Sequence, residues 1–468
     1  MGTTKASRAA KSAPPTQTLP PTTFIIDNGA FTMKAGYAPD APPQASDNPT
    51  QPLSSCLVIP NALARTRDKR VYVGPQLTTH ISDWNEVTFR RPLEKGYIVN
   101  WEAQREIWDH TFFNEKIARK PEVKCADPAD TTLVLTEAPN AMVALQKNAD
   151  EIIMEEWGFG GYVRCIGPTL NAWNEVHPLF GDPVLQDQTS TLSPIECLLV
   201  IDSGYSHTTV TPVYNGRPLQ RGIRRLEVGG KFLTNYLKEL VSIRQYNMMD
   251  EPYIINEAKE AVCYVSNDFA GDMERTWKGN KKRGLENAGD GIVLDYVLPD
   301  PNAQKKGFVR PHDTMRAAKM KKDLLTGAGP AASSEDVLVL GNERFTVPEL
   351  LFNPQDIGLK QLGIPEMVTQ SLSMLPTGLH PAFLANILVV GGNSLLPGFM
   401  ERLEAGLRQL ASAECIVRVR RPADPIRSTW LGAARFASNK ESLKQIAVTR
   451  QQYQEHGSAW VGRRFSGS

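Results

Sequence analysis

Two aspartates stand at the same place in two copies of one short sequence pattern. Each copy is an apolar run that leads into Asp-[Asn/Ser]-Gly and is followed by a second β-rich run; the copies are Thr23–Gly29 and Leu199–Gly204. Because glycine tolerates backbone angles that other residues avoid, each copy predicts a β-hairpin. If both hairpins face one cleft, backbone amides at their turns could hold the phosphates of a nucleotide. Asp27 and Asp202 would then orient a hydrated divalent metal ion. A single such pattern would instead favour an ordinary structural hairpin.

The composition sets limits on the architecture and on the partners. The chain has 468 residues, 41% of them hydrophobic, and a net charge of +1. This length suits two domains or one large bilobal domain. A nearly neutral chain has no general attraction to nucleic acid, so any such contact requires a local patch. No apolar run reaches the length of a membrane span, and we expect no membrane partner.

The cysteines and the N-terminal segment indicate an intracellular protein. The cysteines are scattered, without a paired spacing, and we expect them to be reduced thiols. Residues 1–22 carry three basic residues among Ala, Ser, Thr and Pro, without an apolar stretch. This segment predicts a disordered tail and not a secretory signal. The cysteines are Cys56, Cys125, Cys165, Cys197, Cys263 and Cys415.

Strand and helix patterns alternate after each copy of the repeated pattern. Between the copies, periodicity predicts helices over 102–114 and 141–157 and a strand over 131–136, which is the order of a βαβ half-domain. After the second copy, a buried strand over 386–390 enters Gly391-Gly392 and then a helix. The start of that helix is a place where an anion or a base could bind.

A basic segment at about 301–336 interrupts the second half. Such a charge run is usually a solvated helix face or a loop, and the sharper alternative is a docking patch for an acidic partner or a DNA backbone. Its basic residues are Lys305, Lys306, Arg310, Arg316, Lys319, Lys321 and Lys322.

Several motifs, in one order, resemble actin and the actin-related proteins from about residue 23 to the C-terminus. They are Ile26-Asp27-Asn28-Gly29, Lys34-Ala35-Gly36-Tyr37, Tyr72-Val73-Gly74, Ile107-Trp108-Asp109-His110, Leu135-Thr136-Glu137-Ala138-Pro139, Asp202-Ser203-Gly204, Cys263-Tyr264-Val265, Gly341-Asn342-Glu343-Arg344-Phe345, Gly391-Gly392 and Trp430-Leu431-Gly432. The resemblance implies an α/β, actin-like (ribonuclease-H-like) bilobal fold with four subdomains around a central nucleotide cleft.

The resemblance also implies a division of the chain. Subdomain 1 would comprise 23–53, 89–174 and 429–468, and subdomain 2 would comprise 54–88. Subdomain 3 would comprise 175–228 and 358–428, and subdomain 4 would comprise 229–357 with the basic segment inside it.

Within the family, three stretches look most like the sixth class of actin-related proteins: 95–101, 255–269 and 296–300. That class implies a non-catalytic scaffold in the nucleus, in a Swr-type chromatin-remodelling complex that exchanges a variant histone. The implied partners are the remodeller ATPase and a zinc-finger HIT-type subunit, with nucleosomal DNA nearby. No homo-oligomer or filament is implied.

Matching the family's motifs residue by residue places a candidate nucleotide cleft, with ATP or ADP and its magnesium ion as ligand. The matching residues are Asp27, Asn28, Gly29, Lys34, Asp202, Ser203, Gly204, Gly230, Lys259, Glu260, Gly391 and Gly392. Lys34 could contact a β-phosphate as a point charge.

The same matching shows what has been lost. Where actins have a small Ser and Gly after the first turn, this chain has Ala30 and Phe31. The family's catalytic-loop aspartate is matched by Tyr205, its water-relaying histidine by Thr209 and its water-positioning glutamine by Ile166. Phosphoryl transfer depends on such positioning groups, so we predict no catalytic residue and no useful ATP hydrolysis.

Alternatives remain for the cleft and for the protein. The cleft could keep a nucleotide as a structural wedge, or Phe31 and Tyr205 could fill the phosphate space. Instead of a scaffold, the chain could be a filament-forming, ATP-hydrolysing actin-like protein, or a phosphotransferase or chaperone ATPase that shares the core. No Cys/His spacing predicts a zinc site.

Overall fold

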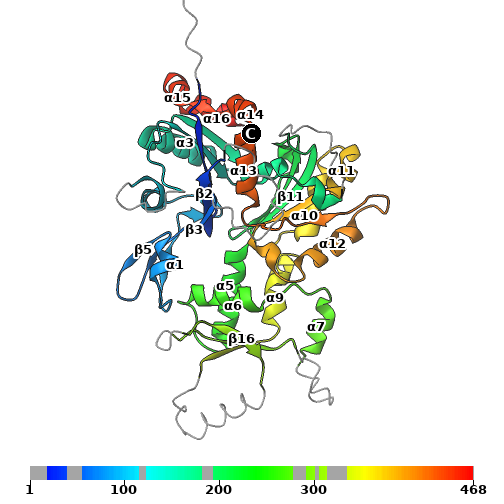
Figure 1. Cartoon of the computed structure of the whole chain (residues 1–468). Helices are drawn as coiled ribbons and strands as arrows, with labels where there is room; N and C mark the ends of the chain where they lie inside the picture. Colours follow the sequence, from blue (N-terminus) through cyan, green and yellow to red (C-terminus); the bar gives the residue numbers. More distant parts are fainter. Residues whose placement is uncertain are drawn as a thin grey trace, which may run out of the picture.

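The computed structural model describes residues 18–39, 55–114, 123–181, 193–277, 291–300, 305–313 and 335–466. Two lobes, each built around a mixed six-stranded sheet, lie side by side, and a smaller sheet extends from each (Figure 1). The helices are α1 Gln76–His80, α2 Trp101–Trp108, α3 Val143–Glu151, α4 Gly167–Leu170, α5 Gly230–Arg244, α6 Pro252–Val262, α7 Phe269–Arg275, α9 Glu343–Glu349, α10 Ile364–Ser373, α11 His380–Ala385, α12 Phe399–Leu410, α13 Ser428–Ser438, α14 Lys440–Ile446, α15 Arg450–His456 and α16 Ser458–Phe465.

The first repeated pattern forms the centre of the first sheet, whose order is β20-β10-β9-β1-β2-β3. β1 pairs antiparallel with β2 and parallel with β9, and the β1–β2 register sets Asp27 opposite Lys34. The strands are β1 Thr22–Asp27, β2 Thr32–Tyr37, β3 Leu57–Pro60, β9 Thr131–Glu137, β10 Gly161–Ile166 and β20 Val448–Thr449.

The second pattern takes the equivalent place in the second sheet, whose order is β13-β12-β11-β18-β19 with β14 also on β12. β11 pairs antiparallel with β12 and parallel with β18, as β1 does with β2 and β9. The strands are β11 Cys197–Ser203, β12 Thr208–Tyr214, β13 Arg217–Pro218, β14 Arg224–Leu226, β18 Ile387–Val390 and β19 Val419–Arg420. The repeated sequence therefore encodes two related half-domains.

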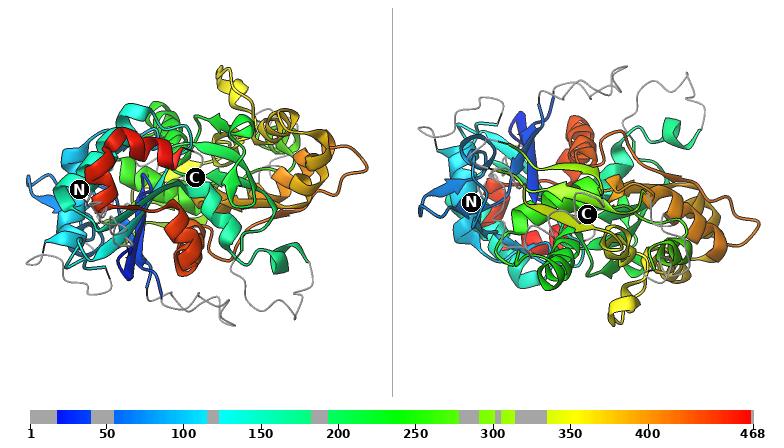
Figure 2. Two further views of the ribbon diagram at one scale, coloured as in Figure 1. Left: turned by 90° about the horizontal axis from the view of Figure 1, so that it is seen from above. Right: turned by 90° about the horizontal axis from the view of Figure 1, so that it is seen from below.

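The central strands are buried on both faces, which explains why they read as continuous apolar runs. In β1, Phe24 and Ile26 face a core that includes α2 and α16, whereas Ile25 faces one that includes α13 and α14. Side chains alternate across a strand, so one run must supply both cores. Figure 2 shows, in two further views, the helices around each lobe.

The two smaller sheets belong to different lobes. One has the order β5-β4-β6, with β4 Leu63–Arg65, β5 Val71–Val73 and β6 Thr88–Arg90; the other has the order β16-β15-β17, with β15 Leu294–Val297, β16 Phe308–Pro311 and β17 Val337–Leu340. A further hairpin joins β7 Leu93–Glu94 to β8 Tyr97–Ile98. We refer to residues 61–90 as the small lobe.

Some predicted boundaries differ from the structure. Subdomain 2 was expected over 54–88, but β3 pairs with β2 in the first sheet, and β6 closes the smaller sheet at Arg90. The sequence of a short apolar strand does not indicate which strand it pairs with, because that pairing is decided by the tertiary structure. The predicted helices over 102–114 and 141–157 each turn into a π-helical segment, at Asp109–Phe113 and Ile152–Trp157. The predicted tail ends where β1 begins, at Thr22, and its residues 1–17 lie outside the described ranges.

The two lobes and the smaller sheet that extends from each agree with the α/β bilobal fold that the resemblance implies. All six cysteines are free thiols, and all except Cys415 are buried. Of the basic segment, Arg316, Lys319, Lys321 and Lys322 lie outside the described residues. Within the described ranges, each helix is too short or too polar to cross a bilayer.

Candidate functional site

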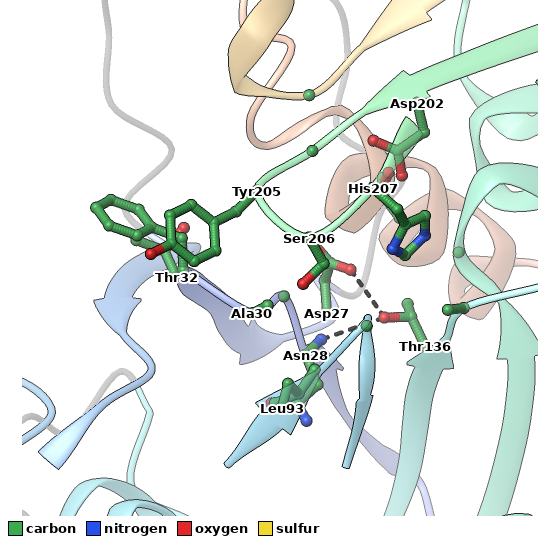
Figure 3. Close-up of a pocket in the computed structure, with 18 of the residues that line it drawn as sticks. Asp27, Asn28, Ala30, Thr32, Leu93, Thr136, Asp202, Tyr205, Ser206 and His207 are labelled. Atoms are coloured by element: carbon green, nitrogen blue, oxygen red, sulfur yellow. Dashed lines mark hydrogen bonds between the residues drawn. The ribbon is translucent and has the colours of Figure 1, made fainter. Parts of the chain in front are cut away.

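A cavity of about 520 Å³ separates the two lobes at the turns of the two hairpins. Figure 3 shows Asp27 and Asp202 entering it from the two lobes. Of the residues predicted for the cleft, the structure brings these to the cavity wall: Asp27, Asn28, Gly29, Lys34, Asp202, Gly204, Gly230, Lys259, Glu260, Gly391 and Gly392. Ser203 does not line it, because its hydroxyl lies within the second sheet, 2.9 Å from Thr208 Oγ1 and 3.1 Å from Asn393 Nδ2.

Asp27 is held and neutralised by its neighbours in the first lobe. Thr136 Oγ1 donates a hydrogen bond of 2.8 Å to Asp27 Oδ1, and Lys34 Nζ lies 3.3 Å from Oδ2. The amide of Asn28 donates to Thr136 Oγ1 at 3.2 Å. Thr136, at the end of β9, therefore fixes the whole turn, a role that sequence reasoning missed because 109 residues separate it from Asp27.

Asp202 has no such support. No hydrogen bond or ion pair to its carboxylate occurs among the described residues. Burial, with the charge of Asp27 as a smaller cause, raises the pKa of Asp202 to about 6. A partly buried carboxylate without partners is unfavourable as an anion, and a hydrated cation would compensate it. No three His, Cys, Asp or Glu side chains gather to ligate a metal directly in the part of the chain that the structure describes.

The two turns keep a backbone surface suited to phosphate. The amides of Ala30, Phe31, Tyr205 and Ser206 make no backbone hydrogen bond among the described residues, and unpaired amides at a turn form an anion-binding concavity. Ala30 supplies no hydroxyl. The rings of Phe31 and Tyr205 contact each other with centroids 4.9 Å apart. Figure 3 shows the Tyr205 ring directed away from Asp202 and His207, so the two rings form a wall of the cavity and leave its interior open.

The opposite end of the cavity would surround a base and ribose. Lys259 is buried there, and its Nζ donates to Gly230 O at 3.3 Å, Thr234 Oγ1 at 3.0 Å and Asn256 Oδ1 at 3.0 Å. Because an ammonium group has three protons, these partners saturate it. Burial lowers the pKa of Lys259. Glu260 accepts a hydrogen bond of 2.8 Å from Asn256 Nδ2. Lys259 thus stabilises the cavity wall and is not free for a ligand.

Two positions that the sequence analysis matched to the family's water-handling groups carry side chains that do not line the cavity. Ile166 is apolar and ends β10, and Thr209 is buried in β12, opposite Asp202. His207, which the sequence analysis did not single out, lines the cavity beside Gly96. Burial, followed by the charge of Arg225, lowers the pKa of His207 to about 3. A general base acts best with a pKa near the working pH, so this imidazole is a poor one.

The residues present fit a nucleotide with a hydrated cation. The unpaired carboxylate of Asp202 suits the cation, and the four free turn amides suit the phosphates. The lining also contains apolar side chains beside the Gly391-Gly392 turn, including Leu396 and Ile426, which suit a flat base.

Comparison with known proteins agrees with this architecture. The family model described as Actin matches residues 18–466. "Actin-like protein arp6" of Aspergillus fumigatus is 67% identical over 468 residues, which is 100% of both chains. "Actin-related protein 6" of Neurospora crassa is 51% identical over 99% of this chain and 98% of its own length, and that of Drosophila melanogaster is 34% identical over 94% and 98%. A family model across nearly the entire length, with relatives that are covered end to end, shows that this chain belongs to the actin family.

Proposed function

We propose that this chain is a non-catalytic, actin-fold scaffold subunit of a nuclear chromatin-remodelling complex of the Swr type. Its partners would be the remodeller ATPase and a zinc-finger HIT-type subunit. One observation supports the non-catalytic part of the proposal. The cavity is present, but the positions at which the family has water-positioning and water-activating groups carry Ile166, Tyr205 and Thr209. The likeness to relatives named actin-related protein 6 supports the assignment to the class.

For the cleft, the proposal is a structural nucleotide. ATP or ADP with its magnesium ion would bind through the turn amides and Asp202 and would not be hydrolysed. Such a ligand binds only the folded state and stabilises it by mass action.

We expect the purified protein to release one adenine nucleotide per chain on denaturation and to show no magnesium-dependent ATP turnover above background. Each lost positioning group typically reduces the rate on the order of a hundredfold or more. Chromatography of the denatured supernatant and a phosphate-release assay measure the two quantities. A protein without nucleotide would overturn the structural-ligand proposal alone, whereas turnover abolished by Asp202→Ala would overturn the non-catalytic proposal.

The partner contacts are proposed on the surfaces that depart from actin: the small lobe, the basic segment and the N-terminal tail. Part of the charge there is already internally paired. Arg67 and Arg70 in the small lobe pair with Glu86 and Asp68, and Arg310 pairs with Asp295 and Glu335. Any DNA contact is therefore expected from the other basic residues, and its binding would depend strongly on salt.

Crosslinking mass spectrometry of the native assembly tests the scaffold role. We expect crosslinks from lysines of this chain, including Lys69 in the small lobe, to a remodeller ATPase and to a zinc-finger subunit. Crosslinks predominantly between copies of this chain, together with magnesium- and ATP-dependent pelleting, would instead establish a filament-forming actin-like protein.

A further inference from the structure

Six side chains form a continuous row of contacts that starts at the cavity wall and connects the two lobes. We call it the aromatic row; its members, in spatial order, are Tyr205, Phe31, Arg91, Phe89, Trp84 and Tyr253.

The inner part of the row is centred on a guanidinium group. Arg91 Cζ lies 4.9 Å from the ring centroid of Phe31, 5.0 Å from that of Tyr205 and 5.3 Å from that of Phe89. Cations within about 6 Å of a ring face are attracted by its quadrupole. Tyr205 belongs to the second lobe and Phe31 to the first, so this cation joins the turns of the two hairpins.

The outer part of the row crosses the cleft a second time. Trp84, in the small lobe, stacks on Tyr253 of α6 with centroids 3.6 Å apart and planes at 6°. The ring centroid of Phe89 lies 6.3 Å from that of Trp84 and 6.4 Å from that of Tyr253. Beside this stack, the amide of Glu86 donates to Glu251 Oε1 at 3.0 Å. These contacts connect the small lobe, which belongs to the first lobe, to α6 of the second lobe.

The environment of the Arg91 guanidinium depends on the contact between the two lobes. No carboxylate pairs with it among the described residues; its Nη1 donates to the carbonyls of Ala30 at 3.3 Å and Phe31 at 3.4 Å. Burial lowers its pKa. A partly buried cation without a counter-ion is favourable only while other groups compensate it, and here part of that compensation comes from Tyr205 of the opposite lobe. Opening the cleft would remove that part.

We propose that the aromatic row holds the two lobes closed without nucleotide or metal. In a two-lobed cleft, a ligand that touches both lobes shifts the population toward closure. Here the row makes the same connection with the protein's own side chains, so closure does not require the ligand. This inference is independent of the scaffold function, since an active enzyme or a filament could also carry the row.

The test measures the distance between the lobes in nucleotide-free protein. Spin labels on Thr78→Cys in α1 and Ile243→Cys in α5 report the opening by double electron–electron resonance, in a Cys415→Ser background because the other cysteines are buried. Nucleotide is removed with EDTA and a phosphatase, and its removal is verified by chromatography. We expect one narrow distance distribution that magnesium-ADP does not shift.

Two variants break the row at different places. Arg91→Met removes the inner cation and keeps much of its volume, and Trp84→Leu removes the outer stack. We expect both to move the nucleotide-free distribution to longer and broader distances, with circular dichroism unchanged. Two matched controls should leave the distribution narrow: Trp277→Leu, at an exposed tryptophan that follows α7, and Arg105→Met. A broad wild-type distribution that ADP narrows, or folded row variants that stay narrow, would overturn the proposal.

Discussion

Replacing Gly391 with alanine is expected to lower the free energy of unfolding by roughly 3 kcal/mol. Gly391 follows β18 with φ 90° and ψ 160°, a region that is essentially restricted to glycine. A Cβ there would lie 2.6 Å from the carbonyl carbon of Ser203 and 2.9 Å from Asp202 Oδ1. Either β18 or the end of β11 must move, and β11 carries the carboxylate that faces the cavity. Urea unfolding followed by circular dichroism measures the loss.

The next residue supplies the control. A Cβ on Gly392 would meet no atom within 4 Å, and Gly392 does not have a positive φ. Gly392→Ala should therefore change stability by no more than about 0.5 kcal/mol, as is usual for positions without such constraints. Equal losses at both positions would contradict the steric explanation.

Removing the charge of Arg164 should have an effect of similar or larger size. Arg164 and Asp150 are buried, with side chains 3% and 1% exposed, and Arg164 Nε lies 3.0 Å from Asp150 Oδ1. Arg164 Nη1 also lies 2.7 Å from Glu137 Oε1. Arg164→Met leaves the buried carboxylate of Asp150 and the partly buried one of Glu137 without their cation. Breaking a buried pair in this way typically costs about 3–5 kcal/mol. The exposed pair Arg105–Glu156 offers a control, because Arg105→Met should cost no more than about 1 kcal/mol.

The pH dependence of the Arg164→Met variant identifies the cause. Burial raises the pKa of Glu137 and of Asp150, and Arg164 opposes both increases. Without Arg164 the folded-state pKa values rise further, so the folded variant binds protons more tightly than the unfolded chain does. The variant should therefore be least stable, relative to wild type, at a pH above the raised folded-state pKa values of the two carboxyls. It should regain stability as the pH falls through those values toward the ordinary pKa values of 4.5 for Glu137 and 3.8 for Asp150. A deficit that is constant across this range in urea unfolding would show that lost packing, and not uncompensated charge, is the cause.

The sequence determined much of the fold, because the relevant signals are local. The apolar runs that end at Asp27 and Asp202 are continuous because β1 and β11 are buried on both faces, and each run is followed at once by its turn. The two half-domains could be identified from that repetition, and the ordered motifs identified the family. The same local reading located the hairpin turns, the Gly391-Gly392 turn and the departures at Ala30, Phe31 and Tyr205.

Only the tertiary structure decided how the side chains of the site are used. Lys259 has the sequence position of a ligand-binding residue, yet Gly230, Thr234 and Asn256 saturate its ammonium group. Ser203 has its hydroxyl turned into the sheet, away from the cavity.

The aromatic row shows the reason for this division most clearly. Phe31 and Tyr205 are 174 positions apart in the chain, and their contact, like that of Trp84 with Tyr253, depends on how the two lobes pack. Secondary structure follows from periodicity along the chain, whereas the partner of a hydroxyl, an ammonium group or a ring is set by distances between segments that the sequence pattern does not fix. The sequence by itself therefore determined the family and the position of the cleft, and the packing of the two lobes decided which of its groups remain available to a ligand.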